Sequence, residues 1–218
     1  MIRALAITVS NRAAAGIYED RSGPVLAGLL KEAGCSVDGP LVVPDGEPVE
    51  AALRDAVASG YDVVVTTGGT GLTPGDLTPE MTRRVLDREI PGIAEAIRAA
   101  GVAAGIPAAM LSRGLAGLAR RVLIVNLAGS SGGVRDGMAV LAPVLAHAVD
   151  QAHGGDHPRS GQDHAPPVSD HARPVSDHAR LGSDHARSGG GRSRPGSGHH
   201  HPDGPETFLS ERPDPDGP

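Results

Sequence analysis

The chain has 218 residues, and its composition changes sharply near residue 150. Nearly all of the Val, Leu and Ile lie before that point, in a length typical of one domain with a single hydrophobic core. The formal net charge of -6 provides no basic field for nucleic acid or anionic lipid, so neither is expected as a partner.

Two further features narrow the class of protein. The one cysteine, Cys35, excludes a disulfide framework and a cysteine-based metal site, and we expect it to be a buried thiol. The N-terminal apolar run is too short for a signal peptide, and no stretch approaches the length needed to span a bilayer. The sequence therefore predicts a cytoplasmic protein with no membrane contact.

Apolar runs alternate with amphipathic stretches along residues 1–152. Buried strands are predicted at 4–9, 37–43 and 61–67, with helices between them at 25–34 and 48–59. Helices at 78–87 and 91–101 follow, then two paired strands at 115–119 and 121–126 with a tight turn near Arg120, and a helix from 134 to about 152. This alternation predicts an α/β domain, a three-layer sandwich in which helices cover both faces of a central, mostly parallel sheet.

Residues 153–218 form a low-complexity tail rich in His, Asp, Gly and Pro, in which SDHAR occurs at 169, 176 and 183. The repeat lacks the apolar positions of a coiled coil and is interrupted by prolines, so we expect disorder. Nine of the ten histidines lie beyond residue 150, mostly beside aspartates. Two interpretations stay open, a solvated extension and a buffer for Ni²⁺, Zn²⁺ or Cu²⁺.

Two glycine-rich loops follow predicted strands. The first is Gly68-Gly69-Thr70-Gly71, and the second runs from Asn126 to Gly133 into a helix N-terminus. Ligands of parallel α/β sheets bind beyond the carboxyl ends of the strands, where such loops let several amides converge on one anion. The pair indicates an extended phosphorylated ligand, although a plain turn is the alternative for the first loop.

Two aspartates, Asp45 and Asp76, fall on loops at the same predicted edge. Carboxylates beside phosphate-binding loops suit a Mg²⁺-dependent nucleotide reaction, whereas an Asx-turn explains Asp45-Gly46 equally well. The loops match neither a Walker motif nor a dinucleotide-binding fingerprint, so the charge of a phosphate must be neutralised by arginine or a metal.

The stretch VTTGGTGLTPGDLTPE at residues 65–80 resembles the TGGTG…D.TPE signature of molybdopterin adenylyltransferases of the MogA/MoaB type. The resemblance covers about residues 3–152 and includes TVSNR at 8–12, EDRSGP at 19–24, VVPDG at 42–46 and NLAGSSGGVRDG at 126–137. It implies an α/β fold, usually assembled as a homotrimer and sometimes as a hexamer. It also implies adenylylation of molybdopterin by the co-substrate ATP, with Mg²⁺, to give adenylyl-molybdopterin and pyrophosphate, alongside other molybdenum cofactor biosynthesis proteins.

The resemblance assigns roles by position. Asp45 and Asp76 match the family aspartates tied to catalysis and Mg²⁺. The residues matching the loop that holds the pterin's phosphate are Gly68, Gly69, Thr70 and Gly71. Those matching the second, nucleotide-side loop are Asn126, Gly129 and Ser130. The N-terminal polar cluster of the molybdopterin site is matched by Ser10, Asp20, Ser22 and Gly23, for which helix capping is the alternative role.

Three positions depart from the family pattern. Gly75 stands where the family commonly has arginine, and Ala128 and Ser131 replace the two prolines of the second loop. A missing arginine weakens charge compensation at a phosphate, and missing prolines loosen the loop. A molybdopterin-binding or scaffold protein without strong catalysis is therefore the second reading, and a molybdenum insertase, whose additional domains this chain lacks, is the third.

Overall fold

The computed structural model describes residues 1–155. They form one six-stranded sheet with the strand order β2-β1-β3-β6-β5-β4. The strands β1 (Ile2–Val9), β2 (Cys35–Val43), β3 (Val63–Thr67) and β6 (Val122–Leu127) are parallel. The strands β5 (Ala116–Ala119) and β4 (Arg88–Glu89) complete one side as an antiparallel pair. Every residue of β3 and β6 is buried, as expected for parallel strands covered on both faces.

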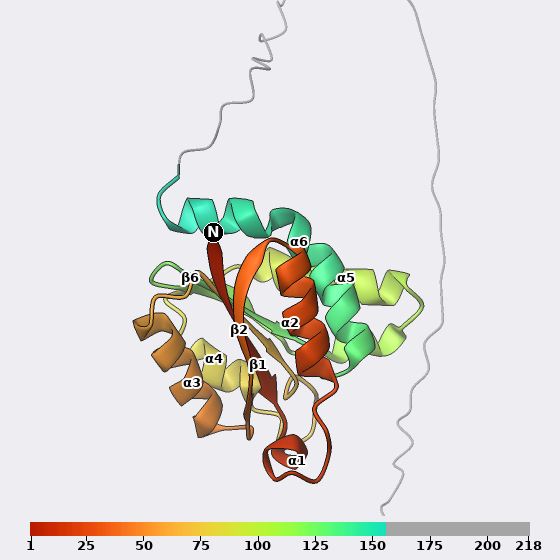
Figure 1. Ribbon diagram of the computed structural model, residues 1–218. Coiled ribbons are helices and arrows are strands. Elements are labelled where there is room, and N and C mark those ends of the chain that lie inside the picture. The colour runs from red at the N-terminus through yellow and green to blue at the C-terminus, as the bar shows by residue number, and fades with distance from the viewer. Residues whose placement is uncertain (156–218) are drawn as a thin grey trace, which may run out of the picture. The chain divides into compact units, whose positions relative to one another are not determined.

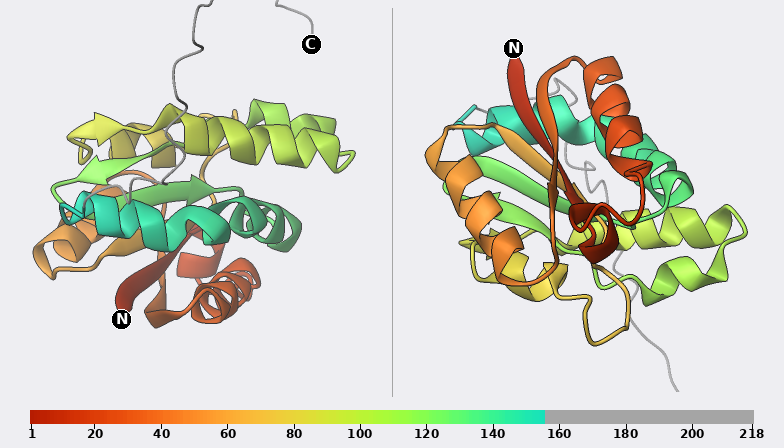
Figure 2. Two further views of the ribbon diagram at one scale, coloured as in Figure 1. Left: turned by 90° about the horizontal axis from the view of Figure 1, so that it is seen from above. Right: turned by 60° about the horizontal axis from the view of Figure 1, so that its bottom comes forward.

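Helices cover both faces of this sheet (Figure 1). On one face, α2 (Ser22–Glu32), α5 (Pro91–Ala103) and α6 (Ser131–Ala152) pack over a core that includes Leu26, Leu141 and Leu145. On the other face, α3 (Glu47–Ala58) and α4 (Thr78–Arg83) cover a second core around Leu53. The right-hand view of Figure 2 shows the sheet between the two groups of helices. The predicted α/β three-layer sandwich with a mostly parallel sheet is confirmed.

Several predicted boundaries differ from the structure. The helix predicted at 78–87 ends at Arg83, and the N–H of Asp87 already donates to the carbonyl oxygen of Leu118 as the chain enters β4. The helices predicted from 25 and 134 begin at Ser22 and Ser131, and the strand predicted at 61–67 begins at Val63. Two short elements were not predicted, α1 (Asn11–Ala14) and the 3₁₀ helix η1 (Pro107–Leu111).

Other expectations are met. Arg120, with φ of 55°, forms the tight turn between β5 and β6, and Cys35 is a buried free thiol whose pKa is raised by burial. Within residues 1–155, no helix combines the length and the apolar character needed to cross a bilayer. The predictions for the tail lie outside the described residues.

The strand register shows which strand ends lie next to one another. Val9 is opposite Val43, Thr8 is opposite Thr67, and Thr67 is opposite Leu127, so β2, β1, β3 and β6 end at the same edge of the sheet. The loops that begin after these strands therefore meet there.

Candidate functional site

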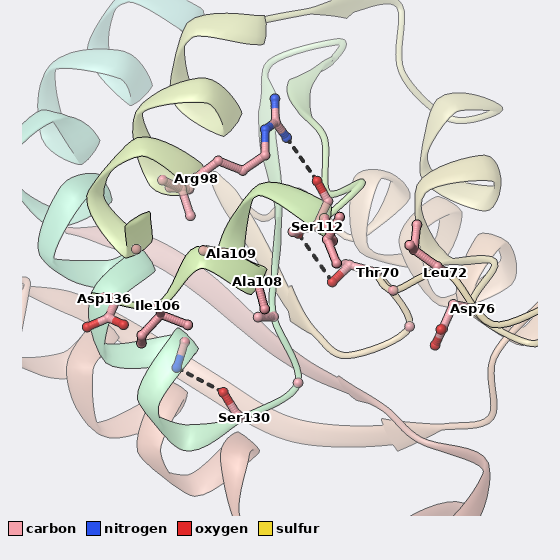
Figure 3. A pocket seen from close by; sticks show the side chains of 18 residues that line it. Thr70, Leu72, Asp76, Arg98, Ile106, Ala108, Ala109, Ser112, Ser130 and Asp136 are labelled. Atoms are coloured by element: carbon pink, nitrogen blue, oxygen red, sulfur yellow. Dashed lines mark hydrogen bonds between the residues drawn. The ribbon is translucent and has the colours of Figure 1, made fainter. Parts of the chain in front are cut away.

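The largest cavity at this edge has a volume of about 620 Å³ and lies between the first glycine loop, η1 and the N-terminal end of α6 (Figure 3). One side is polar and includes Gly69, Thr70 and Asp76. The other side is largely apolar, with Ile97 and Ile106 among its lining residues. The cavity therefore offers a surface for a flat, partly apolar group next to a loop suited to an anion.

A second cavity of about 560 Å³ lies between the first glycine loop and the N-terminal segment. Arg12 and Arg21 line it, and Arg12 also lies over the ring of Tyr18, with 5.5 Å between the guanidinium carbon and the ring centroid. The two cavities share three lining residues, namely Gly69, Gly129 and Ser130. Groups bound in the two cavities would therefore meet along this common rim.

Backbone amides are available at the rim. The N–H groups of Gly69, Thr70 and Gly71 donate no hydrogen bond to any residue in the described part of the chain. Across the rim, Ser130 caps α6, since its Oγ accepts a hydrogen bond from the N–H of Gly133 at 3.0 Å. The start of α6 adds further unpaired N–H groups and the positive end of the helix dipole.

Asp45 lies against the first glycine loop. Its Oδ1 accepts hydrogen bonds from the N–H groups of Gly46 at 2.8 Å and Leu77 at 3.0 Å. Its Oδ2 faces Gly69 so closely that a methyl group added there would lie 2.1 Å from this oxygen. Burial raises the pKa of the Asp45 carboxyl, the two N–H groups lower it, and the negative charges of Asp76 and Glu80 raise it further. One oxygen of Asp45 thus makes an Asx-type contact with Gly46, while the other oxygen faces Gly69.

Asp76 lines the first cavity, and only one of its two carboxylate oxygens accepts hydrogen bonds from the residues that the structure describes. Its Oδ2 accepts hydrogen bonds from Thr73, at 2.9 Å from the backbone nitrogen and 2.6 Å from the hydroxyl. Its Oδ1 has no hydrogen-bond partner among residues 1–155, and the same holds for Oδ2 of Asp45. Each aspartate therefore keeps one oxygen for a ligand beside the same loop.

The remaining predicted site residues separate into two groups. Gly68, Gly69, Gly129 and Ser130 line the second cavity together with Ser10, Asp20 and Ser22. Asn126 lines neither cavity, because its amide donates to the hydroxyls of Thr66 and Thr82 and its oxygen accepts from the N–H of Leu115. It joins β6 to β3, α4 and the start of β5. The assignment of Asn126 to the nucleotide-side loop stays a prediction.

The N-terminal cluster acts chiefly through capping. Asp20 Oδ1 accepts from the N–H groups of Ser22 and Gly23 at the start of α2, while its Oδ2 accepts from the hydroxyl of Thr8 at 2.7 Å. Ser10 caps α1 by accepting from the N–H of Ala13. Gly23 is buried. There is no room for a side chain at this position, since a methyl group would lie 2.2 Å from Asp20 and 2.3 Å from Thr8. These contacts shape the wall of the second cavity.

Sequence reasoning did not find the arginine that holds the first glycine loop. Arg113 follows η1, and its guanidinium donates to the carbonyl oxygens of Gly71 and Asp76 and to the carboxylate of Glu80. Its partners lie 33 to 42 residues earlier in the chain, so no local pattern links them. The only sequence signal was the absence of an arginine next to Asp76.

Comparison with known proteins agrees with this geometry. Residues 5–147 match the family model described as "Probable molybdopterin binding domain". A molybdopterin adenylyltransferase of Pyrococcus furiosus is 37% identical over 150 residues, which cover 67% of this chain and 88% of that protein. A molybdenum cofactor biosynthesis bifunctional protein of Synechococcus elongatus is 38% identical over 156 residues, which cover 71% of this chain. The chain spans about half of the length of that relative, 48%.

Solved structures show the same similarity. The molybdopterin biosynthesis Mog protein of Mycobacterium ulcerans superposes with a TM-score of 0.67 at 51% identity, over 70% of this chain and 99% of that one. The matched region contains both glycine loops and both aspartates of the site. The chain therefore belongs to the molybdopterin-binding MogA/MoaB family of molybdenum cofactor biosynthesis proteins.

Proposed function

We propose that the protein adenylylates molybdopterin, with ATP as co-substrate and Mg²⁺ as the metal, and so releases adenylyl-molybdopterin and pyrophosphate. A terminal phosphate oxygen of molybdopterin attacks the α-phosphorus of ATP. The new bond joins that oxygen to the α-phosphorus, and the bond from the α-phosphorus to the bridging oxygen of the β-phosphate breaks. The electron pair leaves with pyrophosphate, so one phosphoanhydride is exchanged for another.

The observation that carries this proposal is the pair of cavities with a common rim. Two phosphorylated reactants must bring an oxygen and a phosphorus within bonding reach, and one reactant in each cavity meets the other at Gly69, Gly129 and Ser130. Unpaired amides at this rim are suited to the negative charge that both reactants carry. The apolar wall of the first cavity suits a pterin ring better than a second triphosphate.

The donor set fits Mg²⁺. This ion takes one or two protein carboxylates and completes its shell with water and substrate phosphate oxygens. Asp45 Oδ2 and Asp76 Oδ1 are two such carboxylate oxygens, and residues 1–155 contain no cluster of three or more His, Cys, Asp or Glu that would hold a metal alone. Where bound, Mg²⁺ supplies positive charge to the phosphate oxygens during displacement.

The protein's own residues have separate tasks in the reaction. The first glycine loop and the start of α6 bind and orient phosphate, and Asp45 and Asp76 would hold the Mg²⁺. None of these tasks needs a general base, because the attacking phosphate oxygen is already ionised near neutral pH.

The test is to incubate the purified chain with molybdopterin, ATP and Mg²⁺ and to measure adenylyl-molybdopterin by mass spectrometry, with Asp76→Asn in parallel. The substitution is nearly isosteric and keeps an oxygen toward Thr73, but it removes the charge that a metal requires. We expect product from the natural chain and at least a hundredfold less from the variant, in line with the loss of a residue that orients reactants. Equal turnover by a folded Asp76→Asn variant contradicts the assignment of this aspartate.

A second candidate function is a carrier that binds molybdopterin without adenylylating it. Gly75 favours it, because the loop beside Asp76 lacks the positive charge that the family commonly has there. Molybdopterin binding without product would support the carrier. Gly75→Arg would then be the first change to make, since open space surrounds this position.

Assembly is part of the proposal. The α5 and η1 segment extends from the sheet (Figure 2) and exposes several large apolar side chains, namely Val102, Ile106, Met110 and Leu111. We propose that the chain works as a homotrimer that covers part of this surface. Sedimentation equilibrium would test it, and a monomer at micromolar concentration would contradict it.

A further inference from the structure

Arg113 binds one side of the first glycine loop. Its backbone N–H donates to the carbonyl oxygen of Thr70 at 2.9 Å, and its Nε donates to that of Gly71 at 2.7 Å. The two terminal nitrogens donate to the carbonyl oxygen of Asp76 and to the carboxylate of Glu80. All four acceptors belong to residues 70–80, and Arg113 lines neither of the two cavities at the rim. The Arg113 side chain thus binds the loop on the side that faces away from the two cavities.

These bonds fix the direction of three successive peptide groups. The carbonyl oxygen of Gly69 accepts from the N–H of Thr78 at 3.1 Å, and those of Thr70 and Gly71 accept from Arg113. In a trans peptide the following N–H points opposite to the carbonyl. The N–H groups of Thr70, Gly71 and Leu72 are therefore directed away from Arg113 and α4.

The opposite side of the loop is the first cavity. Gly69, Thr70, Gly71 and Leu72 all line it. The N–H groups of Thr70, Gly71 and Leu72 have no acceptor among residues 1–155. Gly69, with φ of 63°, supplies the left-handed residue with which a concave row of amides begins. Three successive unpaired donors beside a cavity are an anion-binding arrangement.

We propose that Arg113 is a positioning residue that aims these three amides at a phosphate group in the first cavity without touching it. The inference rests on the proposed function only for the identity of that phosphate, the terminal phosphate of molybdopterin. Arginine suits the task because its planar fork reaches several acceptors at once, which a lysine cannot do.

The contribution of Arg113 is geometric. Its positive charge is paired with Glu80. Burial is the largest single influence on the Glu80 carboxyl and raises its pKa, but the hydrogen bond and positive charge of Arg113, a backbone N–H and the charge of Arg83 together lower the pKa. Glu80 is thereby kept ionised, and the pair adds little net charge to the cavity. Loss of Arg113 would remove the orientation of the loop and leave Glu80 unpaired, and an experiment must separate these two effects.

The probe is inorganic pyrophosphate, which needs only the amides and no pterin. Calorimetric titration is expected to give saturable binding to the natural chain and roughly tenfold weaker binding to Arg113→Met, the effect of losing a charged hydrogen-bond anchor. Hydrogen exchange should show protection of residues 68–77 by pyrophosphate in the natural chain alone. Arg83→Met is the matched control. Arg83 also lowers the pKa of Glu80 through its charge, but its own ion pair is with Glu89 at 2.9 Å and it does not bond to the glycine loop.

The double variant Arg113→Met/Glu80→Gln separates geometry from charge. It removes both members of the ion pair, so an electrostatic effect would disappear and binding would recover. We expect binding as weak as in Arg113→Met. Recovery to the natural affinity, or an Arg113→Met variant that binds as tightly as the natural chain, overturns the proposal.

Two further comparisons keep the test decisive. If thermal melting shows that Arg113→Met does not fold, Arg113→Lys keeps the charge and most of the stem, and it too must bind pyrophosphate more weakly. Pyrophosphate binding that needs Arg113 in a chain without adenylylation would sustain this inference and overturn the proposed function. Undiminished binding in the variants of a chain that does adenylylate molybdopterin would do the reverse.

Discussion

Asp45 carries a conflict between stability and ligand binding. Its carboxylate is partly buried, and the nearby charges of Asp76 and Glu80 disfavour its ionised form, so its pKa is raised. A raised pKa in the folded state means that the carboxyl favours folding when protonated, at pH below its ordinary pKa. This contribution is lost as the pH rises through the folded-state pKa.

Asp45→Asn should therefore stabilise the fold at neutral pH while abolishing adenylylation. The amide oxygen can still accept from Gly46 and Leu77, and the unfavourable charge is gone. After allowance for solvent screening, we expect a rise in Tm of about 1–2 °C, equivalent to ~0.5 kcal/mol. Melting curves from pH 3 to 8 should show this gain growing with pH, and a variant that melts lower at neutral pH would contradict it.

Gly71 leaves no room for a side chain beside Asp76, so a substitution there should affect the reaction. A methyl group on Gly71 would lie 2.8 Å from Oδ2 of Asp76, and that flexible side chain is its close neighbour. Gly71→Ala should move Asp76 by a few tenths of an ångström and lower turnover by about tenfold to a hundredfold, with a change in Tm below about 2 °C.

Gly75→Ala is the matched control for Gly71→Ala. Nothing lies within 4 Å of the added methyl group, although both glycines belong to the same loop. Its turnover should equal that of the natural chain. Comparable losses in the two variants would show that loop flexibility, and not the position of Asp76, limits the reaction.

The acidic residues and glycines of the site were predictable from the sequence, but the residues that contact them in the fold were not. Asp45 and Asp76 follow strand ends and carry a recognisable motif, and the structure brings both to the first loop. The orienting role of Arg113 depends on contacts across 33 to 42 residues, which local spacing cannot predict. Asn126 shows the opposite case, since its motif predicts a ligand contact, whereas its side chain is buried and bonded to Thr66 and Thr82.

The elements show a similar division. Strand and helix types were predictable because the apolar runs of β1, β3 and β6 are continuous and the helices are amphipathic. Helix starts were predicted late at α2 and α6, where the capping residues Asp20 and Ser130 precede the first apolar turn. The two-residue β4 has no apolar pattern and exists only through its pairing with β5.

The cap of α6 gives a prediction at the scale of the element. Ser130→Ala removes the oxygen that accepts from Gly133 and should destabilise the domain by ~1 kcal/mol, a fall in Tm of about 2–4 °C. Ser130→Asn keeps a capping oxygen and should recover most of this loss in a thermal melt. Equal melting of the two variants would show that the cap contributes nothing to stability.

The whole molecule combines two cores with a long tail. Both hydrophobic cores consist of residues between Ile2 and Val149. The parallel part of the sheet was predictable from strand and helix alternation, but the antiparallel addition of β4 was not. The strands β4 and β5 are separated in the chain by α5 and η1, so no local sequence pattern indicates that they pair.

Truncation after residue 157 tests whether the cores suffice. Because each core residue precedes that point, we expect Tm within about 2 °C of the full chain and unchanged adenylylation. The measurement is differential scanning calorimetry of both chains under identical conditions. A much lower Tm in the truncated chain would mean that the tail contributes to the stability of the domain.

Isotope labelling would show whether the protein transfers the α-phosphate of ATP, with its adenosine, to molybdopterin. The chain is incubated with molybdopterin, Mg²⁺ and ATP labelled at either the α- or the γ-phosphate. We expect the α-label in adenylyl-molybdopterin and the γ-label in pyrophosphate. Transfer of the γ-label to molybdopterin, or no transfer by a chain that binds both reactants, would contradict the proposed function.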